Sequence, residues 1–202
     1  MSWGWIECGR VCIVWLGFPC ESWTLARKFD GGPPPLRSYS ELWGRSAITS
    51  QHDLEKIKIG NALLVFTGKT IKKAVYHRVP GGAENPDSAR SWTALDTVAS
   101  TDGVIRDRST DYCPFGTAWR KRTKVRHWLV NLDGAMIFCK SNKGICDYTG
   151  KRHIQLVGKD AAGVYLTFRA QPYPPSWCEK IVQCFLHALT SLSDARIFKL
   201  LS

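Results

Sequence analysis

The chain has 202 residues, of which 44% are hydrophobic, so it is long enough and nonpolar enough for a sizeable globular core, which excludes a disordered chain. Its 28 Lys and Arg against 17 Asp and Glu give a net charge of +11, which favours polyanionic partners, most simply nucleic acid. No nonpolar run approaches the roughly 20 residues of a membrane-spanning helix, so no membrane association is expected.

The amino terminus and the cysteines indicate the compartment. The first ten residues contain Glu7 and lack a basic segment followed by a nonpolar one, so no signal peptide is predicted. Eight cysteines without a secretion signal are expected to be reduced thiols and not a disulfide framework. We therefore expect an intracellular protein, nuclear if its source is eukaryotic.

The first predicted element is a strand that leads to a cysteine. Residues 11–16 (VCIVWL) are nonpolar and rich in β-branched and aromatic side chains, which is typical of a buried strand, and Gly17 ends the run. A turn at Pro19 then presents Cys20. Residues 28–52 are expected to form a long loop, because the Pro and Gly residues at 31–35 disfavour both helix and central strand.

A helix and a second strand are expected to follow. A helix is predicted from Asp53, as its cap, to about Arg78, with nonpolar residues on one face. Residues 79–84 are predicted to form a short strand that ends at Glu84. A strand, a helix and a strand form a crossover unit with parallel pairing and a right-handed connection. Cys20 and Glu84 would then lie at the same carboxyl edge of neighbouring strands, unless residues 84–86 form an ordinary turn.

Shorter elements are predicted in the second half of the chain. A short helix is expected at 91–99 and strands at 104–105, 128–130 and 164–168. The last predicted element is a helix from Trp177 to about Leu189, whose nonpolar face is expected to be core.

A basic cluster with an aromatic side chain occupies residues 119–126 (WRKRTKVR). Lys and Arg side chains suit phosphate contacts, and Trp119 suits base stacking. A solvated basic loop is the alternative interpretation of the same residues.

Cys139, Cys146 and His153 form a C-x6-C-x6-H pattern, to which Cys113 would add a fourth ligand. Zinc sites usually contain tighter pairs, with two residues between the cysteines. Buried thiols and a surface histidine without a metal are therefore the favoured interpretation. A small zinc-binding interaction domain remains an alternative.

Three stretches, in the same order as in the family, resemble motifs of the cytosine-5 DNA methyltransferases. Residues 19–26 (PCESWTLA) resemble the nucleophile motif Pro-Cys-Gln-x-Phe-Ser-x-Ala, and residues 84–86 (ENP) match Glu-Asn-Val/Pro. Residues 116–123 (GTAWRKRT) are a looser match to Gly-x-Pro-Gln-x-Arg-x-Arg. Four further stretches are similar to a divergent subgroup of phages and retroelement-type mobile elements: 32–37 (GPPPLR), 58–61 (KIGN), 155–160 (QLVGKD) and 170–174 (AQPYP).

This resemblance implies an α/β fold. The expected architecture is a partial Rossmann-like methyltransferase sheet with helices on its faces, plus a basic irregular C-terminal region. Residues 1–135 would form the catalytic half. Residues 136–170 would form a basic target-recognition-like segment with Cys and His, and residues 171–202 a helix that packs back on the core.

The resemblance also implies roles for individual side chains. Cys20 would be the thiolate that adds to C6 of a cytosine flipped out of the duplex, and Glu84 would stabilise the ring as charge develops. Arg120 and Arg122 are expected at the catalytic site, where cations help to ionise a thiol. Contacts with nucleic acid are expected from Arg27, Arg37, Asn85, Trp119, Lys121 and Lys124.

The family's cofactor, S-adenosylmethionine, is expected from the resemblance, but its main binding motif is absent. In the family a Gly-rich strand and loop precede the nucleophile motif, whereas here only about ten residues precede the first strand. An upstream segment or a second chain would then supply the cofactor half. The alternative function is a catalytically silent nucleic-acid-binding module of a mobile-element polyprotein, with DNA or RNA as the ligand.

Overall fold

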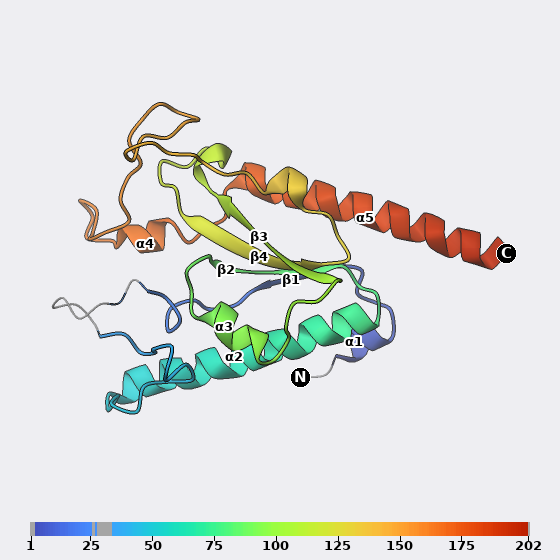
Figure 1. Cartoon of the computed structure of the whole chain (residues 1–202), viewed down its shortest axis with the longest axis horizontal. Coiled ribbons are helices and arrows are strands. Elements are labelled where there is room, and N and C mark those ends of the chain that lie inside the picture. The colour runs from blue at the N-terminus through green and yellow to red at the C-terminus, as the bar shows by residue number, and fades with distance from the viewer. Residues whose placement is uncertain (1–2, 26, 28–33, 202) are drawn as a thin grey trace. The chain divides into compact units, whose positions relative to one another are not determined.

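The computed structural model describes residues 3–25, 27 and 34–201, with side chains as far as Ser191. The described residues form a mixed α/β structure, as predicted (Figure 1). The helices are α1 (Gly4–Glu7), α2 (Gln51–Tyr76), α3 (Ser91–Asp96), α4 (Leu166–Arg169) and α5 (Pro175–Leu201), with 3-10 turns η1 (Cys113–Phe115) and η2 (Asp133–Ala135). The strands are β1 (Val14–Gly17), β2 (Gly81–Pro86), β3 (Ile105–Asp111) and β4 (Arg122–Trp128).

The chain divides into two compact units. Unit 1 consists of Met1–Asp107 and Lys124–Val130, and unit 2 of Arg108–Thr123 and Asn131–Ser202. This division differs from the three segments expected from the sequence, because residues 108–123 group with the C-terminal part of the chain.

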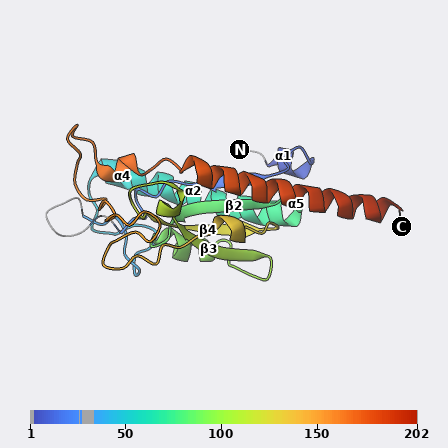
Figure 2. The same cartoon turned by 90° about the horizontal axis from the view of Figure 1, so that it is seen from above.

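The predicted crossover unit is present. The mixed sheet has the strand order β1-β2-β4-β3, and β1 pairs with β2 in parallel from Val14↔Gly81 to Gly17↔Glu84. Helix α2 connects the two strands and contacts β2. Helix α2 and strand β2 run side by side in Figures 1 and 2. The predicted parallel pairing is therefore confirmed. β1 is shorter than the predicted strand 11–16, and β2 continues beyond Glu84 to Pro86.

Two glycines at the start of β2 accommodate tryptophan side chains. A Cβ on Gly81 would overlap the ring of Trp128 and lie 2.6 Å from the Val14 carbonyl oxygen, and one on Gly82 would lie 2.7 Å from the ring of Trp15. Trp128 also donates a hydrogen bond from Nε1 to the Val79 carbonyl at 2.8 Å. Glycine within a strand often marks such a close approach. The two glycines thus fix the position of β2 beside β1.

Helix α2 begins one turn earlier than predicted. Ser50 is its N-cap, and the Ser50 hydroxyl accepts a hydrogen bond from the Asp53 backbone N–H at 3.4 Å. The prediction that Asp53 caps the helix is therefore wrong. Asp53 lies in the first turn, where its charge suits the helix dipole, and it pairs with Arg27. The buried face of α2 includes Ile57, Leu64, Ile71 and Ala74.

Two predicted strands of the second half differ from the structure. The strand expected at 128–130 is β4, which begins at Arg122 and therefore contains much of the basic cluster. Thr123 and Val125 are buried while Arg122 and Lys124 are partly exposed, so charges alternate with inward side chains. The strand expected at 164–168 is wrong, because residues 166–169 form α4, none of whose residues is buried.

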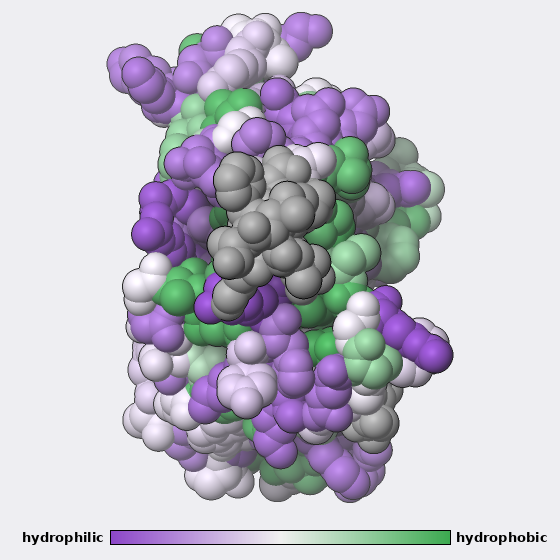
Figure 3. All heavy atoms as spheres, turned by 90° about the vertical axis from the view of Figure 1, so that its right-hand side faces the viewer, coloured by the Kyte–Doolittle hydropathy of each residue, from purple (hydrophilic) through white to green (hydrophobic). Residues whose placement is uncertain are grey.

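The surface is predominantly polar on the face shown in Figure 3, with nonpolar residues in small groups between hydrophilic ones. Trp5 and Tyr76 are exposed, and exposed aromatic side chains are common on protein surfaces. Among the described helices, none has the length and nonpolar composition needed to cross a membrane.

Candidate functional site

In unit 1, the parallel register brings Glu84 to the end of β1. Glu84 pairs with Gly17, the last residue of β1, and Cys20 follows Gly17 by three residues. Glu84 is only 6% exposed, and Cys20 is half-buried. Glu84 therefore lies beside the carboxyl end of β1, as predicted, and β2 continues two residues beyond it. The chemical roles of Cys20 and Glu84 remain predictions.

Asn85 holds the loop that carries Cys20. Its Nδ2 donates to the Phe18 carbonyl at 2.8 Å, and its Oδ1 accepts from the Ser91 hydroxyl at 3.1 Å. The Cys20 carbonyl accepts the Trp23 backbone N–H at 2.9 Å, which closes a turn. Because Asn85 is 1% exposed and its amide is engaged, the expectation that it contacts nucleic acid is corrected. Asn85 is a positioning residue for the Cys20 loop.

Arg37 is also buried, which corrects its expected role at a nucleic acid. Its guanidinium carbon lies 3.4 Å from the centre of the Trp23 ring, and the side chain is 0% exposed. Burial lowers the Arg37 pKa to about 10, which keeps the group charged at neutral pH. Its N–H groups donate to the carbonyls of Ser22, Leu42 and Ile57, to the Ser22 hydroxyl and to Asn61 Oδ1. Arg37 therefore ties its loop to α2 and to the Cys20 segment.

Two other predicted contact residues of unit 1 have acidic neighbours. Arg27 pairs with Asp53 at 3.2 Å, and Lys124 Nζ lies 3.9 Å from Asp87 and 5.5 Å from the Trp92 ring. Both basic side chains retain some exposure, 17% for Arg27 and 25% for Lys124. Lys124 and Asp87 are the more exposed of the two pairs, and Arg27 is held mostly away from solvent.

The remaining predicted contact residues belong to unit 2. Lys121 is partly exposed, and its Nζ lies 4.9 Å from the centre of the Tyr112 ring. Trp119 is half-buried, and its Nε1 is buried without a hydrogen-bond partner among the described residues. Of the residues predicted to contact nucleic acid, unit 2 thus contains Trp119 and Lys121.

Arg120 and Arg122 share one buried carboxylate, that of Asp111. Arg122 binds it through two N–H groups at 3.0 and 2.9 Å, and Arg120 Nε lies 3.3 Å away. The Cys139 backbone N–H donates to the same carboxylate at 2.9 Å. Burial opposes ionisation of Asp111, but the hydrogen bonds from Arg122 and Cys139 and the two positive charges outweigh it and lower its pKa. Sequence reasoning missed Asp111, since its partners follow only from the β3–β4 hairpin.

We expect Asp111→Asn to lower the stability of unit 2 by about 2 kcal/mol, because it removes the charge that both arginines and the Cys139 amide bind. Hydrogen exchange should show faster opening at the Cys139 amide. Asp133→Asn is the matched control, since the Asp133 carboxylate is 64% exposed and pairs with Arg108 on the surface. Equal effects of the two changes would contradict the role assigned to Asp111.

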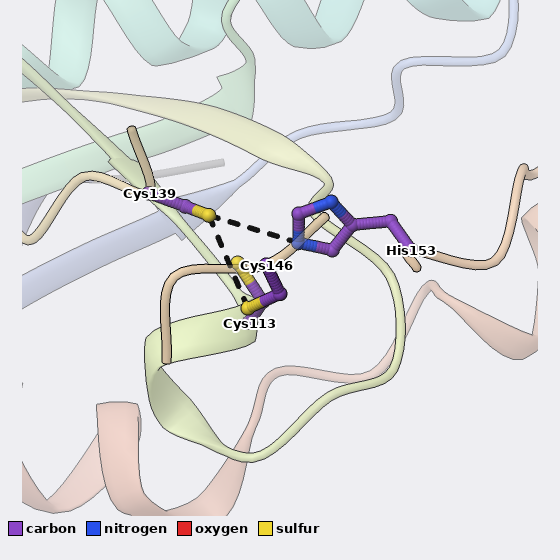
Figure 4. A group of neighbouring side chains, drawn as sticks. All are labelled: Cys113, Cys139, Cys146 and His153. Atoms are coloured by element: carbon purple, nitrogen blue, oxygen red, sulfur yellow. Dashed lines mark hydrogen bonds between the residues drawn. The ribbon is translucent and has the colours of Figure 1, made fainter. Parts of the chain in front are cut away.

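Three cysteines and a histidine converge in unit 2. The ligand atoms of Cys113, Cys139, Cys146 and His153 all lie within 4.8 Å of one another, and all four residues are buried. Figure 4 shows the side chains pointing toward one another from separate segments, with Cys113 on η1. His153 is 7% exposed, so the expectation of a surface histidine is wrong. Each cysteine of the chain is a free thiol in the structure.

The backbone around this cluster is a tight hairpin. The Ile145 N–H donates to the Asn142 carbonyl at 2.8 Å, and Lys143 and Gly144 both have positive φ, as in a type I′ turn. The His153 N–H donates to the Gly144 carbonyl at 2.9 Å, and Cys146 N–H to the Lys151 carbonyl at 2.8 Å. This pairing brings Cys146 and His153 to the same end of the hairpin.

The three thiols differ in acidity. Burial raises the Cys113 pKa, with a further contribution from Cys139, and burial together with the bond to Asp147 raises that of Cys139. Burial also opposes ionisation of Cys146, but the Thr149 hydroxyl and the backbone N–H groups of Tyr148 and Thr149 outweigh it and lower its pKa to about 6. Cys146 is thus the most acidic of the three thiols.

An open cavity of about 410 Å³ adjoins His153 in unit 2. Arg120 and Lys121 contribute to one part of its lining, and Ser141, Gly144 and residues 153–156 to another. The hairpin that carries the histidine therefore also shapes a basic hollow of the surface.

Comparisons with protein-family models, with curated proteins and with solved structures found no match to this chain.

Proposed function

We propose that the chain is a cytosine-5 DNA methyltransferase-like protein in which the Cys20 thiolate adds to C6 of a cytosine and Glu84 stabilises the ring. Its sheet would be part of a Rossmann-like methyltransferase sheet. The observation that supports the proposal most directly is the parallel register of β1 and β2, which puts Glu84 opposite the end of the strand that leads to Cys20. The carboxyl ends of parallel strands are where such sheets bind their ligands.

The chemistry requires a nucleophile and a group that responds to charge on the ring. When the thiolate adds, a sulfur–C6 bond forms and the electron pair of the C5–C6 double bond moves toward C5 and N3. A carboxyl group at N3 stabilises this charge, and its effect is strong where water is excluded. Glu84, at 6% exposure, meets that condition. C5 then takes a proton from water, and loss of the original C5 proton and of the thiolate restores the cytosine with a solvent hydrogen at C5.

The charge of the chain supports a nucleic-acid substrate. Its net charge of +11 provides a long-range attraction to phosphates, and Arg27, Lys121 and Lys124 keep partly exposed cations. Trp119 adds an indole that suits stacking. A cytosine in a duplex must leave the stack to reach a protein thiol, at a cost of a few kcal/mol that these contacts would offset.

The residues present do not fit S-adenosylmethionine as the family binds it. Among the described residues, β1 leads into Pro19 and Cys20, and β2 ends at Pro86 and leads into Asp87. Neither strand leads through a glycine-rich loop into a helix, the arrangement that the resemblance implies for the cofactor. We therefore derive no methyl-transfer step for this chain.

Thiolate addition is measurable without a methyl donor, because the adduct makes the C5 hydrogen exchangeable. With duplex DNA that carries tritium at C5 of cytosine, we expect the chain to release tritium to water, and Cys20→Ser to abolish the release. Cys12→Ser is the matched control, since Cys12 is exposed and lies before β1. A duplex with 2-pyrimidinone in place of cytosine should form a covalent adduct at Cys20, identified by mass spectrometry.

The purified chain and duplex DNA also distinguish the proposed thiolate chemistry from a catalytically silent nucleic-acid-binding module. Both require DNA binding that falls at least about tenfold between about 50 and about 200 mM salt. Salt-sensitive binding without tritium release or adduct would overturn the thiolate chemistry and leave the silent nucleic-acid-binding module. Absence of binding at low salt would overturn both.

A further inference from the structure

We propose that Cys113, Cys139, Cys146 and His153 bind one zinc ion in unit 2, through three thiolate sulfurs and the histidine Nε2. The site is separate from Cys20 and Glu84, which belong to unit 1. It would hold the fold of unit 2 and take no part in the addition to cytosine.

The distances between ligand atoms match a tetrahedral zinc site. With Zn–S bonds of about 2.3 Å and a Zn–N bond of about 2.0–2.1 Å, two sulfurs are about 3.8 Å apart, and a sulfur and a nitrogen about 3.6 Å. Cys139 Sγ lies 3.9 Å from Cys146 Sγ and 3.7 Å from His153 Nε2. The largest separation within the group is 4.8 Å, so a contraction of about 1 Å completes the tetrahedron.

The ligand set and its burial indicate a structural site. Three thiolates and one imidazole are soft and borderline ligands that favour zinc over hard cations such as Mg²⁺ and Ca²⁺. Four protein ligands complete the coordination, whereas catalytic zinc keeps one position for water. Cys113, Cys139 and Cys146 are each 2% exposed, as expected for a closed site.

Groups around the four residues are placed to support a metal. Ser141 Oγ lies 3.5 Å from His153 Nδ1, so that an Nδ1–H directed at the hydroxyl leaves Nε2 free as the ligand. Backbone N–H groups of Tyr148 and Thr149 donate to the Cys146 sulfur, as in many thiolate sites. Each thiol gives its proton to solvent when the metal binds, including the Cys139 proton that Asp147 accepts at 2.6 Å.

The segment that carries three of the ligands has little regular secondary structure. Pairing from Asn142 to Tyr165 consists of three isolated bridges: Asn142↔Ile145, Ile145↔Arg152 and Lys159↔Tyr165. The three cysteines form a buried cluster of their own. Small folds with few core contacts commonly use a structural metal. A bound ion would replace weak thiol contacts by four coordinate bonds.

The test is the metal content and spectrum of the full chain purified under reducing conditions. We expect one zinc per chain by elemental analysis. After zinc is removed and Co²⁺ added, we expect the visible bands of tetrahedral cobalt and an intense thiolate charge-transfer band. Cys139→Ser, Cys146→Ser and His153→Ala should each weaken zinc binding by more than about 100-fold. His153→Cys should retain one zinc and strengthen the charge-transfer band.

Cys12→Ser and Cys178→Ser are the matched controls, because Cys12 belongs to unit 1 and Cys178 lies on α5, outside the four-residue group. Both should retain one zinc. Stoichiometric zinc in Cys139→Ser and His153→Ala would overturn the proposal. The zinc proposal would also fail if the reduced wild-type chain bound neither zinc nor Co²⁺ in a tetrahedral site. That result does not depend on whether any variant folds. A Cys139–Cys146 disulfide, seen as a loss of two hydrogens in the mass of the fresh chain, would overturn it as well.

Discussion

Gly81→Ala is expected to lower the stability of unit 1 by about 3 kcal/mol, because the strand has no room for a methyl group. The new Cβ would overlap the Trp128 ring and lie 2.6 Å from the Val14 carbonyl oxygen, which belongs to the neighbouring strand. Relief requires either a shift of a buried indole or a separation of β1 from β2. Urea unfolding of the full chain, followed by tryptophan fluorescence, measures the loss.

The matched control for this change is Gly103→Ala in the same unit. Nothing lies within 4 Å of a Cβ at Gly103, so we expect its effect to stay within about 0.5 kcal/mol. A Gly81→Ala variant as stable as Gly103→Ala would mean that β1 and β2 do not pair in the observed register. The same result would remove the observation on which the role of Glu84 depends.

Arg37→Met is expected to destabilise unit 1 by about 4 kcal/mol, because a similarly long nonpolar chain leaves buried acceptors without donors. The guanidinium makes five hydrogen bonds, one of them to Asn61 Oδ1 at 2.7 Å, and stacks on Trp23. Methionine keeps part of the packing and none of the N–H groups. Guanidinium chloride unfolding reports the change in free energy.

Arg106→Met is the matched control, because Arg106 is an exposed arginine of unit 1. Its replacement should change stability by no more than about 0.5 kcal/mol. If Arg37→Met also reduced DNA binding while leaving stability unchanged, Arg37 would act at the nucleic acid as the sequence first indicated. Equal stability losses in both variants would show that the buried hydrogen bonds contribute little.

The parts of the fold that the sequence predicts are those set by local pattern. A nonpolar strand, a helix with one nonpolar face and a second short strand define the β1–α2–β2 unit, and the parallel rule then places Glu84 near Cys20. The predicted ends of the elements are less accurate than the elements themselves, because a helix cap depends on one side chain. Ser50 and Asp53 both have cap chemistry, and only the backbone shows that Ser50 has the role.

Roles that depend on distant partners could not be predicted. Arg37 lies in a loop rich in proline and glycine, where a basic residue is usually exposed, and only the packing against Trp23 shows that it is buried. The basic cluster predicts Arg122 as a cation for a ligand, but its guanidinium binds Asp111, eleven positions earlier. In both cases the charge was visible in the sequence and its partner was not.

The cluster of three cysteines and His153 illustrates the same limit. The spacing of Cys139, Cys146 and His153 is looser than that of common zinc motifs, and Cys113 is far away in sequence. A tight turn at Lys143 and Gly144 compensates for the wide spacing by folding the hairpin back on itself. Sequence spacing is therefore a weak guide when a turn with positive φ brings ligands together.

The discontinuous make-up of unit 2 has a consequence for how the protein is synthesised. Cys113 leaves the ribosome before β4, whereas Cys139, Cys146 and His153 follow it, and most of β4 belongs to unit 1. Unit 1 has all its residues once position 130 is made, while Cys113 waits for partners up to 40 positions later. Until those residues are made, Cys113 lacks the neighbours that bury it in the folded unit. Capture of a metal ion would be a late step, and it would join chain segments made before and after β4.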